Sequence, residues 1–414
     1  MKKLILIIIV LCSVNNVRAA DYWQKITVPT TKNLLSVSFG SKNIGFIAGV
    51  DSTLLKTTDG GKNWIKINPK GMTFLKSTPD ITDLFFVNDL VGFALVGQVD
   101  NPYYKGVLYK TTDGGNNWVI ENADIAAQAI FFFDENNGFQ VGSKFFSGKN
   151  VIKLSSGVWQ SPKHFSFDPA ELLHTVDFYN TNVGVTAGDS GYVYRTFDAG
   201  SNWDTVKTNT DAKIEGIRYL NENIILATTD NFNGSVIIST DKGKTWNFNS
   251  GTATFEYPIF KSLAISSKDS VIFAGKYYPT GKGAIYYYNG SVLNTFIAEE
   301  PLTHVGLSDG STAFIVGNNG LVLSNIFETT EINETNGSSP RTKIFPNPTS
   351  GIINIMSRDE QELVVDDAMG RRILEDKVLA KERIVDLTKQ SKGLYFIELK
   401  TRKGERTRTK LIVK

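Results

Sequence analysis

An eight-residue pattern, Ser/Thr-x-Asp-x-Gly-x-(Asn/Thr)-Trp, recurs four times in this chain and constrains its fold more than any other feature. Repetition of this kind indicates a repeat protein. Within each octet the Asp can accept backbone N–H bonds two residues on, a Gly supplies a position with φ > 0, and the Trp anchors the outgoing strand by burial. The octet therefore predicts a hairpin turn. Its assigned residues are Asp59, Gly61, Trp64, Asp113, Gly115, Trp118, Asp198, Gly200, Trp203, Asp241, Gly243 and Trp246.

The octets punctuate units of four short strands. In the first unit, β-branched and aromatic segments separated by Gly/Asn/Asp turns occupy 34–39, 45–49, 53–56 and 64–67. Later units begin near residues 81, 129, 174, 214, 260 and 303, although the octet decays in the third, sixth and seventh. A period of about 43 residues is typical of four-stranded propeller blades.

The last unit stops after three strands, and its missing strand lies at the start of the chain. The segment 21–28 matches the strand that follows the first octet and has no unit of its own. It would complete the seventh sheet and close a ring, which removes exposed edge strands. The prediction is an all-β fold, a seven-bladed β-propeller over 21–326, with six or eight blades as the alternatives.

The octet resembles the Asp-box of the bacterial neuraminidase-repeat, sortilin and photosystem II assembly factor-like propellers. In those families the motif is a structural turn, so the resemblance implies architecture more than activity.

The first 20 residues read as a secretory signal peptide. Lys2 and Lys3 precede an apolar run over 4–12, and small residues stand before Asp21. The single cysteine, Cys12, lies inside this segment and follows a Leu rather than a small residue, which argues against lipidation. Past residue 20 no apolar stretch is long enough to cross a bilayer, and no cysteine is present for a disulfide or thiol chemistry.

The C-terminal part of the chain differs from the propeller in its sequence pattern and charge. Residues 327–342 are polar and turn-rich, which predicts a linker, and 343–414 alternate apolar and polar residues as a small β-sandwich of about seven strands would. Residues 341–414 are basic, with 17 Lys+Arg against 11 Asp+Glu, whereas 21–340 carries 24 against 31. A mildly acidic body does not favour nucleic acid as a partner.

Residues 343–414 contain a Phe-Pro-Asn-Pro-Thr-x-Gly opening, an Asp-x-x-Gly-Arg turn at 367–371, a Gly-Leu-Tyr-Phe strand and a Lys-Leu-Ile-Val ending. With these motifs the segment resembles the type A C-terminal sorting domain of the Bacteroidota type IX secretion system. The resemblance implies passage through the type IX translocon, processing by a sortase, and release or attachment at the outer-membrane cell surface. An accessory carbohydrate-binding sandwich is the alternative. The matching residues are Pro346, Asn347, Pro348, Gly351, Asp367, Gly370, Arg371, Gly393 and Tyr395.

Catalytic signals are weak. A sialidase binds its substrate carboxylate with three arginines, but 21–340 contains only Arg195 and Arg218. Another glycoside hydrolase stays open as the alternative function, because Asp83, Asp177 and Glu215 lie on or next to predicted innermost strands and two carboxylates suffice for that chemistry. The three histidines lack metal-binding spacing, so we expect no metal and no cofactor.

Aromatic residues recur in the loops that join the second and third strands of four units. Such loops lie on the face opposite the octets and offer flat apolar platforms beside hydrogen-bond donors. We therefore expect a secreted or cell-surface binding propeller that holds an extracellular glycan or protein on this face. An assembly-factor role would call for an arginine-rich patch, which two arginines do not make. The candidate ligand-binding residues are Tyr103, Tyr104, Phe145, Phe146, Phe232, Tyr277 and Tyr278.

Overall fold

The computed structural model of the chain separates into two compact units, Met1–Phe327 and Glu328–Lys414. None of the described residues forms an α-helix, so none provides a helix that could span a membrane. The described residues are 23–72, 78–97, 106–123, 126–144, 148–165, 171–231, 236–248, 258–266, 270–278, 280–288, 293–308, 310, 312–325, 342–345, 352–357, 361–367, 371–376, 382–401 and 406–413.

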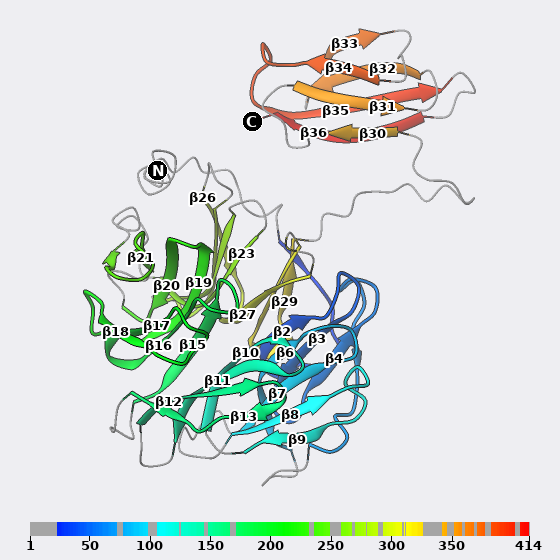
Figure 1. Ribbon diagram of the computed structural model, residues 1–414. Helices are drawn as coiled ribbons and strands as arrows, with labels where there is room; N and C mark the ends of the chain where they lie inside the picture. The colour runs from blue at the N-terminus through cyan, green and yellow to red at the C-terminus, as the bar shows by residue number, and fades with distance from the viewer. Residues whose placement is uncertain are drawn as a thin grey trace. The chain divides into compact units, whose positions relative to one another are not determined.

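The first unit is a β-propeller. Its described residues form seven antiparallel sheets, numbered here in chain order, and the first strand of each sheet is the innermost (Figure 1). The strands are, in sheet 1, β2 (Leu34–Phe39), β3 (Gly45–Gly49), β4 (Leu54–Thr57) and β5 (Ile65–Lys66); in sheet 2, β6 (Asp80–Phe86), β7 (Gly92–Gly97), β8 (Val107–Thr111) and β9 (Val119–Asn122); in sheet 3, β10 (Ala126–Asp134), β11 (Asn137–Lys144), β12 (Gly148–Ser155), β13 (Val158–Trp159) and β14 (Lys163–His164); in sheet 4, β15 (Leu173–Phe178), β16 (Gly184–Gly188), β17 (Tyr192–Thr196) and β18 (Asp204–Lys207); in sheet 5, β19 (Ile214–Asn221), β20 (Ile224–Thr229), β21 (Val236–Ser239) and β22 (Asn247–Phe248); in sheet 6, β23 (Pro258–Ile265), β24 (Val271–Tyr277), β25 (Gly283–Tyr288) and β26 (Leu293–Ala298); and in sheet 7, β27 (Leu302–Leu307), β28 (Ala313–Gly317), β29 (Val322–Ser324) and β1 (Gln24–Lys25).

The N-terminal strand closes the ring as predicted. In sheet 7, β1 pairs with β29, with Gln24 opposite Ser324 and Lys25 opposite Leu323. Trp23, which precedes β1, is buried in the core between sheets 6 and 7. The two ends of the propeller therefore share one sheet, which completes the last blade to four strands and closes the ring.

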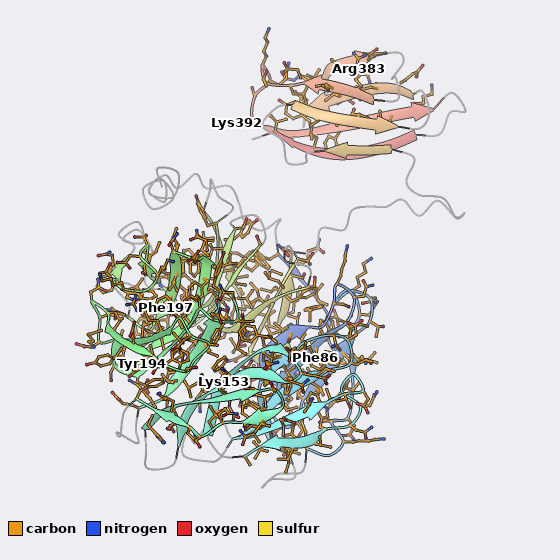
Figure 2. All side chains as sticks on the ribbon, in the orientation of Figure 1. Phe86, Lys153, Tyr194, Phe197, Arg383 and Lys392 are labelled. Carbon is orange, nitrogen blue, oxygen red and sulfur yellow. The ribbon has the colours of Figure 1, made fainter. Side chains whose placement is uncertain are left out.

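Apolar side chains between neighbouring sheets form the core. The second strands of sheets 1, 4 and 7 are buried at every residue, because both of their faces are covered. Phe86 of sheet 2, marked in Figure 2, stacks on Phe46 of sheet 1 with ring centroids 3.7 Å apart. The same stacking joins Phe93 to Phe132 across sheets 2 and 3 at 3.6 Å. Each sheet thus packs face to face on the next.

Every innermost strand carries a β-bulge at the same place. The register slips by one residue near the start of all seven strands, between the first and third residues of the segments that begin at 34, 81, 127, 173, 214, 260 and 302. A bulge re-aims the extra side chain. The seven bulged residues are Leu35, Thr82, Gln128, His174, Glu215, Lys261 and Thr303.

In several sheets a glycine of the second strand pairs with the residue just before the bulge, where the two backbones come close together. A Cβ at Gly188 would lie 1.9 Å from Leu172 O, and one at Gly275 would lie 2.0 Å from Ile259 O. No side chain fits at such distances, so these two positions require glycine. Gly97 ends β7 opposite Asp80, one residue past this position, and its Cβ would meet nothing nearer than 3.9 Å.

The octets form turns whose polar groups are used within the turn. In the first octet the Thr57 hydroxyl accepts from Gly61 N at 3.0 Å and donates to Asp59 Oδ1 at 2.8 Å. Asp59 Oδ1 accepts from Asn63 N, four residues on rather than the expected two, because Thr57 Oγ1 already accepts from the nearer amides. Trp64 Nε1 donates to Gly61 O at 3.0 Å. The other three octets repeat these bonds.

The described residues of the second unit form two sheets with seven strands in total, the number expected for the sandwich. At its Asp-x-x-Gly-Arg turn, Asp367 accepts from Arg371 N at 2.9 Å and from Arg371 Nε at 2.7 Å. Tyr395 is buried and donates its hydroxyl to Ser391 O at 2.6 Å. The strands are β30 (Thr342–Phe345), β31 (Ile352–Ser357) and β34 (Glu382–Asp386) in one sheet and β33 (Arg372–Asp376), β32 (Gln361–Asp367), β35 (Gly393–Thr401) and β36 (Arg406–Val413) in the other.

Candidate functional site

The innermost strands enclose a central channel of about 620 Å³. Because the seven strands share one register, their side chains lie at equivalent levels. The bulged residues form the level nearest the loops between second and third strands, and two further levels follow along the strands. The next level holds Ser36, Asp83, Ala129, Thr175, Gly216, Ser262 and His304. The level after it holds Ser38, Phe85, Phe131, Asp177, Arg218, Ala264 and Gly306.

Side chains of the second level bind each sheet to its neighbour. An acceptor there takes the backbone N–H of the following sheet's innermost strand, which has no strand partner on its inner side. Five of these bonds are present among the described residues: Ser36 Oγ from Leu84 N at 3.1 Å, Asp83 Oδ2 from Ile130 N at 3.3 Å, Thr175 Oγ1 from Ile217 N at 3.1 Å, Ser262 Oγ from Val305 N at 3.3 Å and His304 Nδ1 from Val37 N at 3.2 Å. Ala129 and Gly216 carry no acceptor at this level.

Of the three carboxylates that line the channel, Asp83 and Asp177 lie below the level of the bulged residues, and both are used by the fold. Asp83 accepts from the Ser36 hydroxyl at 3.0 Å and from Leu84 N at 2.9 Å, in addition to the bond described above. Asp177 accepts from Tyr219 N at 2.8 Å. Burial raises the pKa of each to about 6, although these donors and the nearby Arg218 act in the opposite direction. Both carboxylates are therefore structural acceptors that also titrate near neutral pH.

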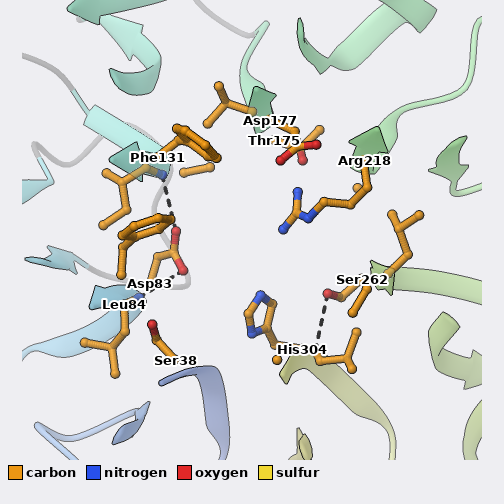
Figure 3. A pocket seen from close by; sticks show the side chains of 18 of the residues that line it. Ser38, Asp83, Leu84, Phe131, Thr175, Asp177, Arg218, Ser262 and His304 are labelled. Atoms are coloured by element: carbon orange, nitrogen blue, oxygen red, sulfur yellow. Dashed lines mark hydrogen bonds between the residues drawn. The ribbon is translucent and has the colours of Figure 1, made fainter. Parts of the chain in front are cut away.

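Arg218 extends toward the centre of the channel, with Phe131 and Asp83 across from it and His304 beside it (Figure 3). Its Nη1 donates to Ile217 O at 2.7 Å. Within the part of the chain that the structure describes, Arg218 forms no ion pair with Asp83 or Asp177, so its guanidinium keeps N–H donors for the channel that it lines.

His304 presents a donor to the same space. Because Val37 N donates to its Nδ1, the proton of the neutral ring lies on Nε2. Burial lowers the pKa of His304 to about 4, and the charge of Arg218 adds to this shift. At neutral pH the ring is thus an uncharged hydrogen-bond donor.

The wall opposite Arg218 is aromatic. Phe85 and Phe131 occupy the third level in the adjacent sheets 2 and 3, with ring centroids 5.6 Å apart and planes inclined by 57°. Both rings are partly exposed, whereas the next residues, Phe86 and Phe132, are buried between the sheets. The channel therefore has one apolar wall and one hydrogen-bonding wall.

Charged side chains surround the mouth of the channel on the side of sheets 3 to 6. The bulged Glu215 pairs with Lys261 and, at 3.2 Å, with Lys213. Burial acts to raise the pKa of Glu215, but these two lysines together hold it below its usual value. The bulged His174 lies 2.9 Å from Asp189, in the short turn between β16 and β17. The mouth is thus polar and nearly balanced in charge.

A buried lysine braces this mouth. Lys149 donates to Asp189 O at 2.7 Å, lies 3.4 Å from Glu171 and sits above the ring of Tyr192. Its side chain is fully buried, and this burial lowers its pKa. Lys149 fixes the loops of sheet 4 against sheet 3, which is a structural role.

The aromatic loop candidates are only partly described. Tyr277 ends β24 and packs against the core of sheets 5 and 6, while Tyr278 begins the following turn and is 55% exposed. The other five, Tyr103, Tyr104, Phe145, Phe146 and Phe232, lie outside the described residues. The expectation of an aromatic platform on this face therefore stays a prediction.

The carboxylates singled out from the sequence do lie on innermost strands, but Arg218, His304 and the Phe85–Phe131 wall were missed as channel residues. Their position in the sequence could have identified them: His304 lies two residues after the start of its innermost segment, and Phe85, Phe131 and Arg218 lie four residues after the start of theirs. No group of three or more potential metal ligands occurs among the residues that the structure describes.

Two family comparisons match different parts of the chain. Residues 15–118 match the family described as photosynthesis system II assembly factor YCF48, and residues 343–414 match the secretion system C-terminal sorting domain. The propeller is thus similar to Ycf48, and the C-terminal segment is similar to the secretion sorting domain. Such a domain implies handling by the type IX secretion system and export to the outer membrane or cell surface.

Individual relatives agree with this assignment. The chain is 29% identical over 269 residues to the photosystem II assembly lipoprotein Ycf48 of Prochlorococcus marinus, which covers 56% of this chain and 78% of that protein. A solved structure of YCF48 bound to D1 peptide shares the fold with a TM-score of 0.56 at 17% identity, covering 73% of this chain and 96% of that one. YCF48 from Cyanidioschyzon merolae gives 0.57 at 15%, with 73% and 98% covered.

Proposed function

We propose that this Ycf48-type propeller is an exported binding protein whose ligand, a glycan or a protein segment, engages the face that carries the channel mouth. The observation that carries the proposal is the channel itself, which combines an aromatic wall with hydrogen-bonding groups that the fold leaves available. Ligand sites of proteins have this composition and typical volumes of roughly 300–1,000 Å³.

The opposite face offers little to a ligand. Each octet aspartate receives backbone and side-chain bonds within its own turn, and these bonds hold the pKa of Asp113 and Asp198 below the usual value. A group already satisfied by its own turn gains little from a new partner. A related YCF48 has been solved with a bound peptide, which supports ligand binding as a use of this fold.

The proposal is tested by comparing the full chain with the double variant Tyr277→Ala/Tyr278→Ala on a glycan array and on a peptide array of surface-protein segments. Phe197→Ala is the matched control, because Phe197 is 45% exposed within the third octet, on the opposite face. We expect binding to fall in the double variant and to persist in the control. Binding that is lost only in Phe197→Ala would place the ligand on the wrong face and refute the proposal.

A second candidate is a secreted glycoside hydrolase acting on polysaccharide. It is favoured by one observation: Asp83 and Asp177 line the same channel, and burial raises the pKa of each to about 6, a value that suits the proton donor of such a pair. Incubation with oligosaccharides followed by chromatography separates the two candidates. Hydrolysis that disappears in Asp177→Asn supports the enzyme, whereas intact oligosaccharide after prolonged incubation supports the binding protein.

A further inference from the structure

We infer that the central channel binds the terminal residue of a neutral saccharide, with one face of the sugar ring on Phe131 and its hydroxyls on Arg218, His304 and the channel carboxylates. This inference rests on the proposed binding function and specifies its ligand class and location.

The charges of the channel exclude simpler ligands. An anion attracted to Arg218 would meet the ionised Asp83 and Asp177, and a cation attracted to those carboxylates would meet Arg218. A wholly apolar ligand would bury the guanidinium without a partner, at a large free-energy cost. A neutral ligand that both donates and accepts hydrogen bonds avoids all three penalties.

Sugar hydroxyls meet that requirement, because each is a donor and an acceptor. Arg218 and the Nε2–H of His304 provide donors. Ser262 Oγ accepts from Val305 N, so its own proton is free to be donated into the channel. Asp83 and Asp177 provide the acceptors, each with lone pairs beyond those taken by the backbone.

The aromatic wall fits the remaining surface of a sugar ring. A pyranose presents C–H groups on its faces, and these pack on the face of an aromatic ring. Phe131 contacts Phe178 and Phe85 contacts Phe132, but Phe131 and Phe85 both remain partly exposed in the channel. The polar bulged residues at the mouth, among them Thr82 and Gln128, leave a wet path for the rest of the saccharide chain.

The test uses the purified full chain and a glycan array of neutral and uronic-acid oligosaccharides, followed by calorimetry with the strongest neutral binder. We expect Phe131→Ala and Arg218→Gln each to weaken binding by about tenfold or more, which corresponds to the loss of one stacking contact or one charged hydrogen bond. Phe197→Ala is the matched control, since Phe197 is 45% exposed within an octet, and it should stay within about twofold.

Arg218→Lys guards against a folding defect, because it keeps the charge but cannot form the planar pair of bonds, and thermal melting reports whether each variant folds. Saccharide binding that is unchanged in both channel variants would overturn this inference and leave the proposed function intact. Preferential binding of uronic-acid oligosaccharides, or of peptides with no neutral saccharide bound, would also overturn it. Absence of any ligand on both the glycan and the peptide arrays would overturn the proposed function as well.

Discussion

Replacing Asp177 with asparagine should change how the stability of the propeller depends on pH. Burial raises the pKa of this carboxyl to about 6 in the folded protein, from an ordinary value of 3.8. The folded state therefore holds the proton more tightly than the unfolded state does. The stabilising contribution of that proton is present below pH 3.8 and is lost as the pH rises through 6.

The magnitude follows from the shift. A difference of about two pKa units corresponds to about 3 kcal/mol, at 1.36 kcal/mol per unit. The amide introduced by Asp177→Asn would not titrate, but its oxygen could still accept from Tyr219 N. The free energy of unfolding of wild type relative to Asp177→Asn should therefore fall by about 3 kcal/mol between pH 4 and pH 7.5.

Tryptophan fluorescence during urea unfolding measures this difference for the propeller alone, because all six tryptophans precede residue 247 and none lies in the sorting domain. Asp113→Asn is the control with the opposite sign. Its bonds to Asn117 and Thr111 hold the pKa of Asp113 below 3.8, so the contribution of that carboxylate is present above this pH and lost as the pH falls. A pH-independent difference between wild type and Asp177→Asn would refute the assignment of Asp177 as a buried channel carboxylate.

Three further substitutions probe the fold. Thr111→Val removes the hydroxyl that accepts from a buried octet amide and should cost about 1–3 kcal/mol in urea unfolding, whereas Thr205→Val, exposed on β18, should stay within about 0.5 kcal/mol. Gly188→Ala should destabilise by about 1–3 kcal/mol because its Cβ would overlap a carbonyl oxygen, but Gly97→Ala, at the end of β7 and one residue past the equivalent position of sheet 2, should be tolerated because its Cβ has room; equal melting temperatures for the two would contradict the close-approach argument. Asp367→Ala removes both bonds to the exposed Arg371 and should lower the unfolding free energy of the sorting domain by about 1 kcal/mol, measured by limited proteolysis of its turn; unchanged cleavage would show that the turn does not depend on them.

The parts of the fold that could be predicted from the sequence are those encoded locally. An octet places its Thr, Asp, Gly and Trp within eight residues, so the turn can be read directly, and the segment before Thr27 could be matched to a strand after an octet. The predicted donor to the octet aspartate was wrong, because Thr57 Oγ1 competes with Asp59 and takes the amide of Gly61, so that Asp59 accepts from Asn63 N instead. That competition depends on the geometry of the turn, which the octet sequence does not reveal.

The channel could not be predicted in the same way, because its residues repeat in position and not in type. The level that joins the sheets contains Ser, Asp, Thr and His acceptors, and any side chain that accepts an N–H bond serves there. The seven bulges shift each register by one residue, which decides which side chains face the channel. In the sequence Arg218 stands out only as one of two propeller arginines. Whether its side chain faces the channel depends on the bulged register of its strand.

The distribution of satisfied polar groups separates the two faces of this propeller. On the octet face each Asp accepts its hydrogen bonds from its own turn, so the carboxylate serves the local structure. In the channel, Ala129 of sheet 3 and Gly216 of sheet 5 have no acceptor for the sheet that follows, so the ring of bonds has gaps between sheets 3 and 4 and between sheets 5 and 6. Asp177 and Arg218 lie on sheets 4 and 5, between these two gaps. Among the described residues, the ring is held by five such bonds, and the amides of Val176 and Leu263 have no acceptor from the preceding sheet. The guanidinium of Arg218, on the sheet between them, also has donors that the fold does not use. The fold thus closes its ring with fewer bonds than it has positions, and the unused donors collect on the side of the channel where a ligand would need them.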